Sequence, residues 1–178
     1  MQNIKSLAYD FLVKSKINSL PITFEKLHSI LSDNDDVLLP YSKAKRILSG
    51  LPEEIGREAE RAMTKNRGIS IMLDKCTIIL YADELSYGER LLVVAHEIGH
   101  KYLEHKRSSV YIYTGNTEDP QEREAQAFAL YILAPPCILR SVKERTSNRI
   151  SQLTGLGKNA TAMVMRNLRS DNKDFTAQ

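Results

Sequence analysis

The run His96-Glu97-Ile98-Gly99-His100 has the residue types and the spacing of a catalytic metal site. Residues four apart lie on one face of a helix, so His96 and His100 can direct two imidazoles at one metal ion as ligands. Glu97 is placed to take a proton from a water molecule that zinc activates for attack on a carbonyl carbon. The surrounding segment is apolar nearly all round and should be buried, where a His-Glu-His trio without a partner would be costly.

A third ligand is needed, because catalytic zinc normally has three protein ligands and leaves one position for water. Glu104 continues the face of His96 but lies eight residues beyond it. At ~1.5 Å per residue that is ~12 Å along a helix axis, too far for a shared ion with bonds of ~2 Å. His105 is excluded for the same reason unless the helix breaks at once. The third ligand should therefore come from another element.

A second helix, opened by Asp119-Pro120, carries the two remaining candidates, Glu122 and Glu124. Glu122 stands three residues after Asp119, where a capping box would give it a structural role. Glu124 has no such role and lies in the first turns of an otherwise apolar helix, where an unpaired carboxylate is costly. We predict Glu124 as the third ligand, with Glu122 as the alternative.

Two longer strings around these residues resemble the ImmA/IrrE family of metallopeptidases. In that family an AHE.GH helix precedes an E.EA..FA..LL.P helix, with an arginine shortly before the first motif. The resemblance covers about residues 68–136, or the β-rich runs and both helices. The matching residues are 95–100, 122–129 and 132–135, with Arg90 as the arginine.

This resemblance implies a gluzincin-like site with one zinc ion, in which both motif histidines and Glu124 are the ligands and Glu97 is the catalytic base. The chain departs from the family pattern at one position. Many members carry a histidine four residues after the second motif histidine, whereas this chain has Glu104 there and His105 one place later. The departure leaves a supporting role for that position in doubt, but does not affect the zinc site.

The helices and strands that we expect to position these residues indicate an α+β fold. It should be mainly helical, with a small β-sheet flanking the pair of active-site helices. The capping box Ser86-x-x-Glu89 predicts a helix that runs through Glu104, and the second helix should stop at Pro135. β-rich runs predict a hairpin whose sheet edge could hold an extended substrate. The predicted strands are 37–39, 69–73 and 76–81, and the predicted earlier helices are 4–12, 24–31, 42–48 and 53–65.

The predicted organisation is a zincin-like metallopeptidase domain followed by a C-terminal helical part. The domain spans 1–136, with a helical part at 1–66 and the sheet and active-site helices at 67–136. The C-terminal part, 137–170, is basic and has the sequence pattern of a helix–turn–helix. Residues 171–178 are predicted to form a flexible tail.

Composition and charge are those of an ordinary globular protein, with 42% hydrophobic residues and a net charge of +3. This net charge is smaller than we expect for a protein that binds nucleic acid. No stretch approaches the ~20 apolar residues of a membrane span, and we expect no export signal. The two cysteines, Cys76 and Cys137, are expected to be reduced and mostly buried in a cytoplasmic protein.

The resemblance implies limited cleavage of a specific protein, typically a helix–turn–helix repressor of a mobile element or stress response. One alternative is a regulatory protein that keeps zinc for structure, does not cleave, and acts by binding a repressor or DNA. Another is a DNA-binding regulator that works through its C-terminal helices. Retention of Glu97, which is not a ligand, favours catalysis. Three tyrosines are open candidates to stabilise an oxyanion: Tyr111, Tyr113 and Tyr131.

Overall fold

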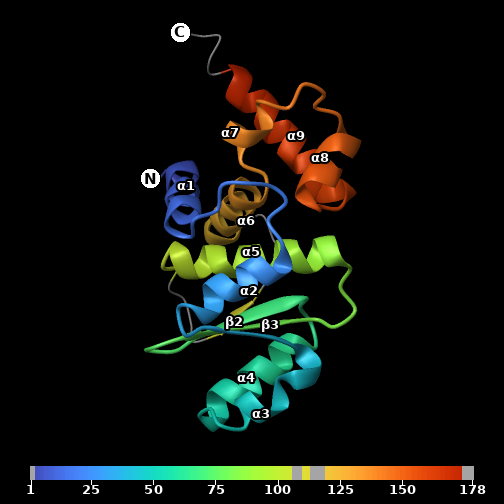
Figure 1. Ribbon diagram of the computed structural model, residues 1–178. Helices are drawn as coiled ribbons and strands as arrows, with labels where there is room; N and C mark the ends of the chain where they lie inside the picture. The colour runs from blue at the N-terminus through green and yellow to red at the C-terminus, as the bar shows by residue number, and fades with distance from the viewer. Residues whose placement is uncertain (1–2, 106–109, 113–118, 174–178) are drawn as a thin grey trace.

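The computed structural model (Figure 1) describes residues 3–105, 110–112 and 119–173, with side chains described in 3–105 and 119–169. The helices of these ranges are α1 (Ile4–Lys14), α2 (Phe24–Ser32), the 3-10 helix η1 (Tyr41–Lys43), α3 (Lys45–Leu48), α4 (Glu53–Met63), α5 (Tyr87–Tyr102), α6 (Pro120–Leu133), α7 (Pro136–Leu139), α8 (Ser147–Thr154) and α9 (Lys158–Lys173). The strands are β1 (Val37–Pro40), β2 (Gly68–Met72), β3 (Thr77–Tyr81) and β4 (Val110–Ile112). The fold is α+β and mainly helical with a small sheet, which confirms the predicted class.

The elements form layers around α5, the long helix near the middle of Figure 1. α6 and α1 pack on one side of α5, and the sheet lies on its other side. The far face of the sheet is covered by α3 and α4. α5 is therefore enclosed from both sides, and its residues 93–100 are all buried.

Within the described residues, the strands form one sheet in the order β1-β3-β2-β4. β2 and β3 are antiparallel neighbours, which confirms the predicted hairpin. β1 pairs with β3 in parallel, and β4 pairs with β2 as an antiparallel edge strand. The sequence did not predict β4, because a three-residue strand in a polar segment has no readable alternation.

The two faces of β2 differ in chemistry, because side chains alternate along a strand. Ile69 and Ile71 are fully buried in the cluster that α3 and α4 cover. Gly68 and Ser70 lie on the opposite face, against α5. The strand thus presents its smallest residues to the helix that carries the histidines.

Caps define the starts of α5 and α6 as predicted. Ser86 and Glu89 form a complete capping box at the start of α5. Asp119 caps α6 by accepting a hydrogen bond from the N–H of Gln121 at 2.9 Å, and Pro120 occupies the first turn. These caps fix where each helix begins, and so which residues share a face.

The end of α5 differs from the prediction, because the helix stops at Tyr102 instead of Glu104. Glu104 has a φ of 53°, in the left-handed region, and its N–H donates to the carbonyl of Lys101 at 3.1 Å. The N–H of His105 donates to the carbonyl of His100 at 3.1 Å. This pair of bonds is a Schellman motif, which usually has glycine at the left-handed position. It turns the chain so that His105 lies against the last turn of α5.

The C-terminal helices share a hydrophobic core with α5 and α6. α8, α9 and the turn between them bury Ile150, Val164 and Leu156 in the same hydrophobic cluster as α5 and α6. Their connecting turn packs on the start of α5 so closely that a Cβ on Gly88 would lie 2.7 Å from the carbonyl oxygen of Gly155. α9 continues to Lys173, so the part of the predicted tail at 174–178 lies outside the described residues.

Both cysteines are free, as predicted, but Cys137 is exposed and Cys76 only half-buried. The prediction that the thiols are mostly buried was therefore wrong. Across the described residues, every helix is too short or too polar to cross a membrane.

Candidate metal centre

Three side chains from α5 and α6 converge on one point: His96, His100 and Glu122. Their donor atoms all lie within 4.8 Å of one another, the only such grouping of metal-ligating residue types that the described part of the chain contains. The Nε2 atoms of the histidines are 2.9 Å apart, and Glu122 places one oxygen 3.2 Å from each of them. Both histidine side chains are 1% exposed and that of Glu122 is 12% exposed, so the point is buried and comes nearest to solvent at Glu122.

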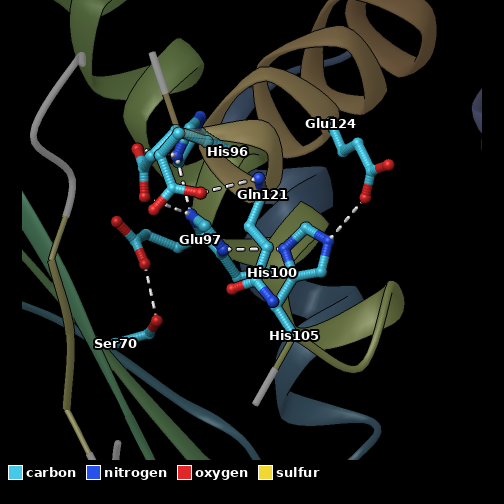
Figure 2. A network of polar contacts seen from close by, with 9 residues as sticks. Ser70, His96, Glu97, His100, His105, Gln121 and Glu124 are labelled. Carbon is cyan, nitrogen blue, oxygen red and sulfur yellow. Dashed lines mark hydrogen bonds and ion pairs between the residues drawn. The ribbon is translucent and has the colours of Figure 1, made fainter. Parts of the chain in front are cut away.

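Glu124 does not join this group, and the sequence-based choice of third ligand is corrected to Glu122. Glu124 extends from α6 away from the histidine pair (Figure 2), and its Oε2 lies 3.1 Å from Nε2 of His105. Its side chain is 37% exposed, so the assumption that it needs a metal to offset burial was wrong. Glu122 does not bend back to cap its helix but points at the histidines.

Helix periodicity explains which carboxylate faces the histidines. Residues at i, i+3 and i+7 share one face, and that face of α6 contains Glu122, Ala125 and Ala129. Both alanines are fully buried. A Cβ on Gly99 would lie 3.0 Å from the carbonyl oxygen of Ala125, so the two backbones are in close contact there. The small residues let the first turn of α6 come near enough for Glu122 to reach both rings.

Glu97 lies beside this group without being part of it. Its side chain is fully buried, and Oε2 accepts a hydrogen bond from the hydroxyl of Ser70 at 2.6 Å (Figure 2). Oε1 has no hydrogen-bond partner among the described residues. Burial raises the pKa of Glu97 to about 7, because desolvation disfavours the charged carboxylate. The carboxyl group is thus held by one oxygen, while the other remains available to exchange a proton.

The three converging atoms suit a divalent cation such as zinc. Burial lowers the pKa of His96, which favours the neutral ring that a metal requires. Burial alone would raise the pKa of Glu122, but its contacts with the rings of His100 and His96 lower that pKa to about 2, so Glu122 carries a negative charge. Lone pairs that face one another at about 3 Å repel unless a positive charge lies between them. Tetrahedral ligand bonds of ~2.0–2.2 Å place neighbouring ligand atoms roughly 3.3–3.6 Å apart. The spacings of 2.9–3.2 Å seen here are only slightly shorter.

A family model described as an IrrE N-terminal-like domain, peptidase family M78, matches residues 55–163. The chain belongs to this family. No curated protein matches the chain. Membership agrees with the resemblance stated above and gives the chain a metallopeptidase-like domain. The matched residues run from α4 into α9 of this family member, so they extend past residue 136 into the C-terminal helices.

Sequence reasoning about this M78 domain missed Ser70 and Gly68, although a signal was present. In the run Gly68-Ile69-Ser70-Ile71-Met72, serine is the lone polar residue of an apolar strand. Alternation places it with the glycine on the face opposite the isoleucines. A buried hydroxyl on such a face needs a partner, and the glutamate of the HExxH helix is the one it finds.

Of the three tyrosines considered for an oxyanion role, Tyr131 is not brought to the site. It lies on α6 two turns beyond Glu124, where Lys5 stands over its ring at 6.0 Å. The backbone of Tyr111 pairs in register with Ser70 of β2, and its side chain, like all of Tyr113, lies outside the described part of the structure. Arg90, the arginine of the family pattern, stacks over Tyr81 at 5.3 Å and so anchors α5 to the sheet.

Gly68→Ala is expected to lower the free energy of unfolding by about 1–3 kcal/mol, the usual cost of overpacking a core. An added Cβ would overlap Cγ1 of Val93, a β-branched residue with little rotamer freedom in a helix. Gly157→Ala is the matched control, because a Cβ there would meet nothing within 4 Å. Urea denaturation compares the two variants. An unchanged midpoint for Gly68→Ala would contradict the close packing of β2 on α5.

Proposed function

We propose that this protein is a zinc-dependent endopeptidase that makes a limited, regulatory cleavage in a specific protein. The observation that carries the proposal is the convergence of His96, His100 and Glu122 beside a buried carboxylate that is not one of the converging ligands. A structural zinc site is closed by a fourth protein ligand, whereas a catalytic one keeps a position for water. Glu97 lies beside the three ligands without joining them, so it can act as a base and does not close the site as a fourth ligand.

The chain's own residues account for the proton transfers of peptide hydrolysis. A bound zinc ion lowers the pKa of water from ~15.7 to ~7 and polarises the scissile carbonyl. Glu97 takes the proton of the attacking water on Oε1 and delivers it to the leaving amide nitrogen. Ser70 holds Oε2 during both transfers, so the carboxyl group keeps its orientation. His96, His100 and Glu122 supply the two neutral nitrogens and the one anionic oxygen of the metal site.

The proposed target is a helix–turn–helix repressor of a mobile element or stress response, which the ImmA/IrrE resemblance supports. We expect such a partner to bind beside the metal centre. A cavity of about 650 Å³ lies between α5, α6 and the start of α9, and its lining includes Leu92, Gln126 and Lys158. Leu92 is one helical turn before His96, so the cavity adjoins the metal centre. A protein substrate bound there would contact the C-terminal helices as well as the active-site helices.

Removing the metal tests the proposal. Purified protein is incubated with candidate repressors, and the products are identified by mass spectrometry. We expect cleavage at one bond of one repressor, its loss after treatment with a zinc chelator, and its return when zinc is restored. Cleavage that continues in the chelated sample would exclude a metal-assisted mechanism. Stable repressor binding without cleavage, in zinc-loaded protein, would favour the non-cleaving regulator instead.

A further inference from the structure

We propose that His105 and Glu124 are positioning residues that fix the tautomer of His100, so that Nε2 of His100 presents its lone pair to the metal ion. The inference rests on the proposed function, because it concerns the same metal centre. It assigns a role to two residues that the reaction itself does not use.

The three side chains form an unbroken line of contacts, shown in Figure 2. Nδ1 of His100 lies 3.0 Å from Nδ1 of His105, and Nε2 of His105 lies 3.1 Å from Oε2 of Glu124. The two rings are 5.1 Å apart between centroids, at an angle of 70°. His105 is 5% exposed, so this line runs through the interior from the metal centre to the half-exposed carboxylate.

The direction of the hydrogen bonds follows from the carboxylate at the end of the line. An ionised carboxylate can only accept, so Nε2 of His105 must carry a hydrogen and donate it to Glu124. In the neutral ring of His105, Nδ1 then carries a lone pair and accepts. Nδ1 of His100 must therefore carry the hydrogen and donate it. Nε2 of His100 then turns a lone pair toward the carboxylate of Glu122 at 3.2 Å, an arrangement that a metal ion between these atoms stabilises.

The Schellman end of α5 places His105 in this line. Residues five apart do not share a helix face, so a continued helix would direct His105 away from His100. The left-handed conformation of Glu104, φ 53°, ends the helix and returns the next residue to the last turn. A non-glycine residue pays about 1–2 kcal/mol for that conformation, and such conformations cluster at functional sites.

Without this line, a histidine is free to carry its hydrogen on either nitrogen. Any fraction of the protein with the hydrogen on Nε2 of His100 cannot bind the metal, and the apparent dissociation constant rises in proportion. Loss of a residue that orients a metal-bound histidine usually lowers metal affinity about 10–100-fold. We expect that range for Glu124→Ala and for His105→Phe.

The tautomers are measured in the zinc-loaded 178-residue chain, labelled with ¹⁵N-histidine. Two-bond ¹H–¹⁵N NMR correlations report which ring nitrogen carries the hydrogen in each of the four histidines. We expect the hydrogen of His105 on Nε2 in the unmodified protein and on both nitrogens in Glu124→Ala. A hydrogen on Nδ1 of His105 in the unmodified protein would overturn the proposal. Zinc-loaded protein that shows the expected tautomers and cleaves no repressor would contradict the proposed function alone.

Zinc affinity is measured by competition with a chromophoric chelator. Glu60→Ala is the matched control, because it removes an exposed carboxylate on α4, outside the line and the metal centre. The proposal requires that Glu124→Ala and His105→Phe weaken zinc binding and that Glu60→Ala does not. Equal affinities for Glu124→Ala and Glu60→Ala would overturn it.

Discussion

Glu97→Gln is expected to bind one zinc ion per chain as before and to lose roughly 10²–10⁴-fold in cleavage rate, the usual contribution of a general base. Glutamine has the shape of glutamate, so its amide oxygen can still accept the hydrogen bond from Ser70. The variant also removes a charge that burial disfavours, so its stability should not fall. Zinc content and initial cleavage rates are measured on the same sample.

Glu60→Gln serves as a control for Glu97→Gln, since it changes an exposed carboxylate on α4, outside the metal centre. It should retain the full rate. An unchanged rate for Glu97→Gln would remove Glu97 as the base. A lost rate together with lost zinc would mean instead that Glu97 helps to hold the metal.

Glu122→Ala is expected to lower zinc affinity by more than about 100-fold, and by more than Glu124→Ala does. Removing Glu122 leaves two nitrogens and no anionic oxygen at the site. Removing Glu124 leaves all three ligand atoms in place and affects only the orientation of His100. Loss of such an orienting residue usually lowers metal affinity by about 10–100-fold. Zinc retained after dialysis against a weak chelator ranks the variants. If Glu124→Ala lost more zinc than Glu122→Ala, the sequence-based choice of ligand would be restored.

The sequence predicted the parts of the site that depend on local spacing. His96 and His100 share a helix face because they are four residues apart, and a capping box fixed the start of that helix. The hairpin of β2 and β3 and the helices α5 and α6 could be predicted for the same reason, because periodicity and caps are local signals. The structure confirms each of these elements with boundaries shifted by only a few residues.

The choice between Glu122 and Glu124 depended on contact between helices, which spacing does not encode directly. The apolar pattern of α6 predicts that the whole helix is buried. On that pattern, an acidic residue that does not cap the helix requires a metal ion as its partner. In fact Glu124 reaches the surface beside His105. The informative residues were Gly99 and Ala125, whose small size marks where the two helices touch. Glu122, three residues before Ala125, lies on that face.

The end of α5 was also beyond local reasoning. A left-handed residue at a helix end is usually glycine, and this chain has Glu104 there, so the sequence carried no stop signal at that position. The rejection of His105 as a direct ligand stands, because its ring lies against the side of His100 away from the metal centre. Its contact with that ring was not foreseen.

The left-handed turn at Glu104 changes what a sequence pattern should look for in such proteins. A motif written with fixed spacing treats a histidine four residues after HExxH and one five residues after it as different features. A helix that ends one residue earlier or later can deliver an imidazole from either position to the same place. A pattern that allows both spacings, and that scores the residue before the histidine for its tolerance of a positive φ, would recover chains that a fixed spacing discards.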